Sequence, residues 1–282
     1  MPELPEVETV RRGLEKQTLG RDWVSIEVLR SRAVASPSDP ALFCLGLRDT
    51  HVSRWRRRGK YLLADLHHAD GSEAGHWGVH LRMTGQFLWI ERPTPVCRHT
   101  RVRLWSASGQ ELRFVDTRSF GQMWWIPPGQ SPETVMGGMA RLGPEPFSPS
   151  FSVVYLRQRL ATTKRAIKTA LLDQSLVAGV GNIYADESLF AAGIRPHTPA
   201  NELNLQQVKR LRDALLEVLE ASIQAGGTTF SDFRHLSGVN GNYGGEAWVY
   251  KRAGQSCRRC GRSIRVDRLG GRGTHWCAHC QT

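Results

Sequence analysis

Helical and β-type hydrophobic patterns occupy different stretches of this 282-residue chain. Near the amino terminus, apolar residues recur at helical spacing until a glycine ends the run, which predicts a helix. These residues are Leu4, Val7, Val10, Leu14 and Gly20. From Ser25 to about Ile126, short β-type runs alternate with glycine- and serine-rich turns, a pattern typical of a sandwich or barrel. The runs cover 25–28, 61–63, 86–90, 101–105, 111–115 and 122–125.

A proline-rich stretch separates this β-type region from a helical one. Between Pro127 and Pro149, six prolines and several glycines suppress regular structure and indicate a linker. Helical patterns then cover 164–173 and 183–192, and a long amphipathic helix follows its expected N-cap, Asn204. Gly226 and Gly227 close that helix, and the glycine-rich stretch 238–245 is predicted to be a mobile loop.

Four of the six cysteines have the spacing of a metal site, C-x2-C-x16-C-x2-C, which is typical of a tetrahedral thiolate zinc centre. They are Cys257, Cys260, Cys277 and Cys280. Two disulfides are the alternative, but they fit poorly in a reducing compartment. The segment has too little core to fold alone, so one structural Zn²⁺ is predicted to stabilise it. The other two, Cys44 and Cys97, are interpreted as small buried hydrophobic residues.

The charge balance indicates a polyanionic partner. Lys and Arg number 38 against 26 Asp and Glu, which leaves a net charge of +12 and a pI near 10.0. Between Tyr250 and Thr282, eight bases accompany a single acid. No run of about 18 apolar residues could span a bilayer, and the acidic, proline-punctuated start is unlike a secretory signal. We therefore expect a cytoplasmic protein with no membrane partner.

Two local features could carry chemistry. Gly179 and Gly181 precede Asn182 at an expected helix start, where backbone amides could bind a phosphate, although a plain helix–helix turn explains them equally well. At the amino terminus, removal of Met1 would leave Pro2 as a secondary amine at a helix start, where the helix dipole disfavours the protonated form, so that some free nucleophile would exist at neutral pH. The alternative, favoured by composition alone, is that proline and glutamate merely begin a helix.

A series of motifs that runs nearly from end to end of the chain then favours the chemical interpretation over the plain helix start. They read PELPEVET at 2–9, RRGKYLL at 57–63, HLRMTG at 80–85, LGPEP at 142–146, VGNIYA at 180–185 and the terminal four-cysteine finger. In this order they resemble the motifs of bacterial formamidopyrimidine-DNA glycosylases. The resemblance implies an α+β fold with DNA bound in a cleft between domains. The expected parts are a catalytic β-sandwich with its N-terminal helix at 1–127, a linker at 128–150, a helix-two-turn-helix domain with a lesion-capping loop at 151–246 and a β-hairpin zinc finger at 247–282.

Catalytic roles follow from the same resemblance. Pro2 matches the nucleophile that attacks C1′ of the damaged nucleotide and forms a Schiff base, and Glu3 matches the proton donor. Lys60 matches a phosphate contact that assists β-elimination. Arg272 matches the finger arginine that grips phosphate and assists δ-elimination. Lys164 and Asn182 match phosphate-binding positions, and His99 matches a further DNA contact. Lys168 matches a DNA-binding position near the lesion pocket.

Three more positions, Met83, Arg118 and Phe120, match the side chains that fill the gap left by a flipped-out nucleotide. The physics suits these residues, because apolar wedges offset lost stacking and an arginine can hydrogen-bond the widowed base. Without the resemblance, Met83 and Phe120 would be taken as ordinary core residues. The chain departs from the family pattern at Thr117 and Ser119, where proline and a second basic residue are common, so one phosphate contact is in question.

These observations predict a monomeric, bifunctional base excision repair enzyme. It would remove 8-oxoguanine and formamidopyrimidines from double-stranded DNA and nick the strand by β,δ-elimination, associating with the nucleoid when bound to DNA. One rival is a sister enzyme of the endonuclease VIII type, which prefers oxidised pyrimidines. The other is a zinc-finger DNA-binding protein without catalysis, which would have no use for an exposed Pro2.

Overall fold

The computed structural model describes residues 1–228 and 247–282, which form two compact units. Unit 1 comprises Met1–Ala140 and the later residues 226–228. Unit 2 comprises Arg141–Ala225 and 247–282. Each unit is described by itself, and the predicted division at 127, 150 and 246 remains a prediction. The predicted loop at 238–245 lies outside the described residues.

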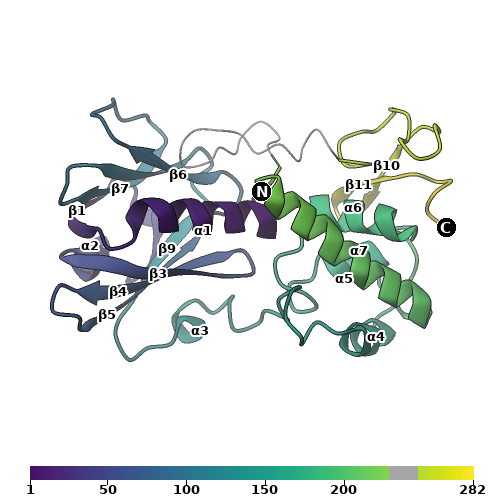
Figure 1. Cartoon of the computed structure of the whole chain (residues 1–282), viewed down its shortest axis with the longest axis horizontal. Coiled ribbons are helices and arrows are strands. Elements are labelled where there is room, and N and C mark those ends of the chain that lie inside the picture. Colours follow the sequence, from purple (N-terminus) through teal and green to yellow (C-terminus); the bar gives the residue numbers. More distant parts are fainter. Residues whose placement is uncertain (229–246) are drawn as a thin grey trace. The chain divides into compact units, whose positions relative to one another are not determined.

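Unit 1 is built on a nine-stranded sheet with the strand order β2-β9-β5-β4-β3-β1-β7-β8-β6 (Figure 1). All neighbours pair antiparallel except β2 and β9. The strands are β1 Asp22–Val28, β2 Val34–Ser36, β3 Thr50–Arg58, β4 Tyr61–His68, β5 Glu73–His80, β6 Gly85–Ile90, β7 Thr100–Ser106, β8 Glu111–Asp116 and β9 Gln122–Ile126. The helices are α1 Leu4–Thr18, η1 Ser31–Ala33, α2 Pro40–Leu47 and α3 Pro132–Val135.

The core of unit 1 is formed by aromatic and aliphatic side chains from most of these strands. Trp23, Trp77, Phe87 and Phe114 are almost fully buried, and burial of each such side chain contributes on the order of 2 kcal/mol. Helix α1 packs on β3 and β4 with its apolar stripe buried, as its periodicity predicted. All six predicted β-type runs are strands in the structure.

Six elements of unit 1 were missed by the pattern reading: β2, α2, β3, β5 and the short helices η1 and α3, of which α3 lies in the stretch predicted to lack regular structure. Strand β3 carries five charged or histidine side chains, and β5 combines glycines with histidines, so neither shows a clean β-type hydrophobic pattern. Cys97 was expected to be buried but is exposed, because it lies in an irregular segment before β7 rather than in a strand. Cys44 is half-buried against the core.

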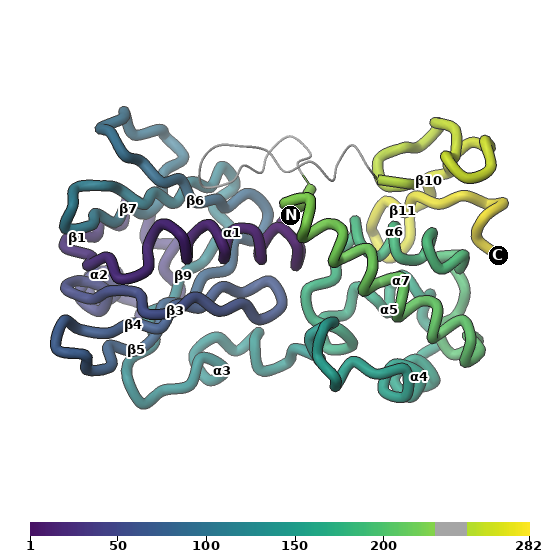
Figure 2. The backbone as a smooth tube through the Cα atoms, in the orientation of Figure 1, coloured from purple at the N-terminus to yellow at the C-terminus, as the bar shows by residue number. Residues whose placement is uncertain are grey.

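Unit 2 is a set of helices followed by a two-stranded hairpin, and Figure 2 traces the path of its chain. The elements are α4 Val153–Ala161, α5 Ile167–Leu171, α6 Asn182–Ala192, η2 Ala200–Glu202, α7 Leu205–Gln224, β10 Arg265–Leu269 and β11 Arg272–Trp276. Helix α7 begins with the predicted cap, since Asn204 and Gln207 exchange side-chain and backbone hydrogen bonds of 2.9 Å. Helix α4 was not predicted, and the run expected at 164–173 contains only the short α5.

Helix α6 is the buried centre of unit 2. Nine of its eleven residues are buried, it packs along α7, and the Tyr184 hydroxyl hydrogen-bonds Ser222 on that helix at 2.5 Å. A helix covered on all sides needs no amphipathic stripe. Within the described ranges of the chain, helices with the length and apolarity to cross a membrane are absent.

Candidate active site

The predicted nucleophile lies at the first turn of α1. Pro2 and Glu3 are both buried, and while Met1 is attached the Pro2 nitrogen is a tertiary amide that cannot attack. The Glu3 N–H donates to the Glu6 carboxylate at 2.8 Å, and the Glu3 carbonyl accepts from Val7 at 3.0 Å. The first turn is therefore held by a side chain from within the helix.

The same Glu6 carboxylate also binds Thr228, a residue of unit 1 that lies far away in the sequence. Its other oxygen accepts the backbone N–H and the hydroxyl of Thr228, both at 2.8 Å. Gly227 has φ +82° and a Cβ there would lie 3.2 Å from the Glu6 carboxylate, so this approach requires glycine. Glu6 lies in the PELPEVET motif, but its contact with Thr228 could not be found from a local pattern.

Lys60 occupies the two-residue turn between β3 and β4, where Gly59 has φ +54°, and its side chain is buried. A salt bridge joins this turn to α1: Arg57 contacts Glu8 at 3.2 Å and donates to the Gly59 carbonyl at 3.0 Å. Burial opposes the charge on Glu8, but Arg11, Arg12 and Arg57 outweigh it and lower its pKa. The helix that carries Pro2 and the turn that carries Lys60 are thus fixed to each other.

His80 is a neighbour of this turn that the pattern reading did not assign. It pairs with Tyr61 across β4 and β5, the two rings meet edge-on at 4.6 Å, and Nδ1 accepts the Arg82 N–H at 3.0 Å. Burial, with the charges of Arg82 and Lys60, lowers the His80 pKa to about 3. The ring is therefore neutral at physiological pH.

A hollow of about 400 Å³ brings together the predicted wedge residues and the chain start. Its walls include Met1, Met83 and Phe120, of which the last two are 37% and 40% exposed. The Arg118 guanidinium lies over the Phe120 ring at 4.9 Å, and Arg32 approaches the same ring at 5.9 Å. The exposure of Met83 and Phe120 agrees with a wedge and not with a core role.

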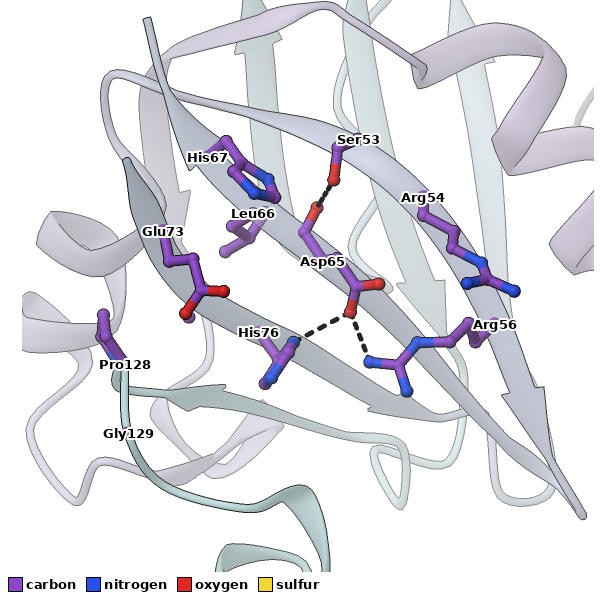
Figure 3. Close-up of a pocket in the computed structure, with 11 residues that line it drawn as sticks. Ser53, Arg54, Arg56, Asp65, Leu66, His67, Glu73, His76, Pro128 and Gly129 are labelled. Atoms are coloured by element: carbon purple, nitrogen blue, oxygen red, sulfur yellow. Dashed lines mark hydrogen bonds and ion pairs between the residues drawn. The ribbon is translucent and has the colours of Figure 1, made fainter. Parts of the chain in front are cut away.

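A second hollow of unit 1, of about 260 Å³, contains none of the predicted site residues. Figure 3 shows that Asp65, at its centre, is already engaged by its neighbours: the carboxylate accepts from His76 at 2.9 Å and also pairs with Arg56. We therefore assign no chemistry to it.

In unit 2, two predicted DNA contacts meet at one backbone carbonyl. The turn of the β10–β11 hairpin is formed by Gly270 and Gly271, both with positive φ, and Arg272 is the exposed residue that follows. The carbonyl of Gly273 accepts a hydrogen bond from Asn182 at 2.9 Å and one from Lys168 at 2.8 Å. Asn182 is the first residue of α6, so this helix start and the finger arginine are held together.

Here the structure departs from the prediction that Lys168 contacts DNA. Its side chain has no exposed surface, and Nζ pairs with Asp186 at 2.7 Å and donates to Thr274 at 2.9 Å. Asp186 in turn accepts the His275 N–H at 2.9 Å. A lysine with every donor occupied inside the protein is not available to a phosphate, so Lys168 instead holds β11 against α6.

The two remaining predicted contacts lie on the surfaces of their units. Lys164 is exposed just before α5. His99 is half-buried before β7, beside Arg98 and Arg101, whose side chains approach its ring at 3.1 and 3.5 Å.

The four finger cysteines converge as a metal site requires. Their Sγ atoms all lie within 4.8 Å of one another and none forms a disulfide. Burial would raise the pKa of Cys277, but backbone N–H groups of Cys280 and His279 lower it to about 7, whereas burial and neighbouring sulfurs raise that of Cys280 to about 12. Four such sulfurs fit one tetrahedral Zn²⁺, which offsets part of the negative charge of the four thiolates.

Comparison with known proteins accounts for nearly the whole chain. Residues 1–123 match the formamidopyrimidine-DNA glycosylase N-terminal domain, residues 142–234 its H2TH domain, and residues 254–282 the zinc finger found in FPG and IleRS. The formamidopyrimidine-DNA glycosylase of Parasynechococcus marenigrum (strain WH8102) is 63% identical over 281 residues, covering 100% of both chains.

Two solved Lactococcus lactis structures give the same result at 34% identity and a TM-score of 0.89. One is a complex with abasic-site DNA, covering 99% of each chain, and the other a complex with DNA containing N7-benzyl-Fapy-dG, covering 100% of each. Fold and site together define a zinc-finger DNA glycosylase of base excision repair. The chain belongs to the formamidopyrimidine-DNA glycosylase family, whose members have glycosylase and abasic-site lyase activities.

The neutral His80 ring should make stability depend on pH. Its pKa is about 3 in the folded protein and 6.5 when exposed, so unfolding between these values takes up a proton. Stability from this group is present above pH 6.5 and is lost as the pH falls toward 3, with a slope of up to about 1.4 kcal/mol per pH unit. Urea unfolding from pH 7 to 4 should show a shallower slope in His80→Gln. Exposed His68→Gln is the control, and an unchanged slope in His80→Gln would contradict the assignment.

Loss of zinc should release the strand that carries Arg272. Cys277→Ser or a zinc chelator is expected to speed amide hydrogen exchange in β10 and β11, because the metal cross-links the two ends of the finger. Zinc content and exchange can be measured on the same samples. Cys97→Ser, which removes an exposed thiol outside the cluster, should change neither. Slow exchange in a fully zinc-free protein would rule out a stabilising metal.

Proposed function

We propose that this chain is a bifunctional glycosylase and abasic-site lyase that excises oxidised purines from double-stranded DNA, chiefly 8-oxoguanine opposite cytosine and formamidopyrimidines. One observation carries the proposal: Met1, whose carbonyl acylates the Pro2 nitrogen, lines the same hollow as Met83 and Phe120. Removal of Met1 would leave a secondary amine beside that hollow. A nucleophile and a wedge at one opening are what an enzyme acting on an extruded nucleotide requires.

The chemistry then follows from the residues present. The Pro2 nitrogen attacks C1′ with its lone pair, and the C1′–N glycosidic bond breaks. The electron pair of that bond leaves with the base, which takes up a proton, while the Pro2 nitrogen gives up its own proton. Glu3, buried beside Pro2, protonates the sugar ring oxygen as the ring opens, which gives an iminium ion. The positive charge withdraws electrons and makes the C2′ proton acidic.

Strand cleavage uses the cationic side chains. Loss of the C2′ proton expels the 3′ phosphate in β-elimination, and a second proton loss expels the 5′ phosphate in δ-elimination. Lys60 is proposed to stabilise the first leaving phosphate and Arg272 the second. Water then hydrolyses the iminium ion and restores the Pro2 amine.

Further phosphates are proposed to bind at His99, Lys164 and Asn182, while Arg118 contacts the widowed cytosine. Support comes from the Lactococcus lactis relatives, which are seen with abasic-site DNA and with N7-benzyl-Fapy-dG DNA. The zinc ion, when bound by the four cysteines, supplies only a structural cross-link. One chain contains every group that these steps need, so we propose that it acts as a monomer, in the cytoplasm and on the nucleoid.

Borohydride trapping tests the proposed nucleophile. Reduction during reaction with an 8-oxoguanine duplex should convert the iminium ion to a stable covalent adduct, detected as a shifted band on a denaturing gel. Pro2→Gly should lose nearly all of the adduct, and so should a form with Met1 retained. Pro5→Ala is the matched control, because Pro5 is a nearby proline in the first turn of α1 without a role in the chemistry. A full yield of adduct from protein that retains Met1 would overturn the assignment.

Lesion choice separates the proposal from its nearest rival. Single-turnover excision should be faster from a duplex with 8-oxoguanine opposite cytosine than from one with thymine glycol, since the wedge set with Arg118 and Phe120 suits the purine enzyme. A preference for thymine glycol would instead indicate an enzyme of the endonuclease VIII type. Binding without excision of either lesion would indicate a DNA-binding protein alone.

A further inference from the structure

Asp116 is an acid, fully buried at the end of β8, that the proposed chemistry does not use. Its backbone N–H donates to the His99 carbonyl at 2.9 Å, and its carbonyl accepts from Arg101 at 2.9 Å. On the other side it pairs in register with Gly85 at the start of β6. The ends of three strands therefore meet at this residue.

The Asp116 carboxylate holds both ends of the loop that bears two wedge residues. One oxygen accepts the Gly121 N–H at 2.7 Å, and the other accepts the Arg118 N–H at 3.2 Å. Between them Ser119 adopts φ +54°, a conformation that is costly for a residue with a side chain. A Cβ at Gly121 would lie 2.6 Å from the Phe114 ring, so the loop is also closely fitted to the core.

Thr84 joins the third wedge residue to this loop. Its hydroxyl donates to the Asp116 carboxylate and accepts the Arg118 N–H at 3.1 Å. Thr84 directly follows Met83 in the turn that leads into β6. One hydroxyl and one carboxylate therefore connect the backbones that carry Met83, Arg118 and Phe120.

We propose that Asp116 and Thr84 are positioning residues that set the wedge before DNA arrives, an inference that rests on the proposed function. Met83 and Phe120 are 37% and 40% exposed, so packing alone does not fix them. Ordering a loose loop during insertion would weaken binding of the extruded state, and a preformed loop avoids that cost. The rival explanation is that the two groups only stabilise the fold.

A pair of substitutions at Thr84 separates these explanations. Thr84→Val keeps the shape and removes the hydroxyl, whereas Thr84→Ser keeps the hydroxyl. Single-turnover excision of 8-oxoguanine from a duplex should fall at least about tenfold in Thr84→Val, because the hydrogen bonds to the Asp116 carboxylate and from the Arg118 N–H are both lost, and be restored in Thr84→Ser. Cleavage of a single-stranded oligonucleotide with an abasic site should stay within about twofold, because no opposite base leaves a gap to fill.

Thr50→Val is the matched control for the loss of a buried hydroxyl, since Thr50 donates to the Leu47 carbonyl at 2.8 Å at the start of β3. It should lower the unfolding temperature without changing the ratio of duplex to single-strand activity. Asp116→Asn, which directs N–H donors at the N–H groups of the loop, should reproduce the duplex-selective loss.

Equal losses on both substrates in Thr84→Val, or none on either, would overturn the positioning role. Failure of the wild-type protein to form the borohydride adduct would count against the proposed function instead.

Discussion

The site depends on hydrogen bonds that backbone N–H groups donate to buried carboxylates. The Glu6 carboxylate accepts the N–H groups of Glu3 and Thr228, and so fixes Glu3, the residue that follows Pro2. A nucleophile at a chain end has little else to hold it, because termini fray unless they are tied down. The Glu8–Arg57 bridge then links the same helix to the Lys60 turn. Carboxylates of α1 thus fix the positions of both Pro2 and Lys60.

In unit 2, a buried carboxylate likewise fixes the position of cationic side chains. Asp186 holds the β11 backbone and the Lys168 ammonium, and Lys168 reaches the carbonyl that Asn182 also contacts. Removing one partner of such a buried pair leaves an uncompensated charge, which costs far more than the pair contributes. The pair therefore acts mainly to fix one arrangement of β11 against α6, with Arg272 at the end of the strand.

Local signals were readable from the sequence, and long-range ones were not. The α1 stripe, the Asn204 cap and the cysteine spacing each depend on neighbours within a few turns of chain, and each is found in the structure. Lys168 was misplaced because its partner lies on another helix, and only the fold shows that a lysine is buried. The contacts of Glu6 with Thr228 and of Asp116 with Thr84 were missed for the same reason, because the partners lie far apart in the sequence. The catalytic assignments came from the family resemblance, since residue type alone favoured a plain helix start at Pro2.

The burial of acidic side chains also bears on how this basic protein can attract a polyanion. A protein with net charge +12 can attract a polyanion only if its acids do not weaken the field at the binding surface. Glu187 shows the solution: it is 1% exposed and accepts the N–H groups of Trp248, Val249 and Tyr250 at 2.8 to 2.9 Å. Burial raises its pKa although these N–H groups oppose the rise. The carboxyl oxygens of Glu187 thus order the segment that leads into the finger from inside the protein, whereas the basic side chains of the finger are mostly exposed.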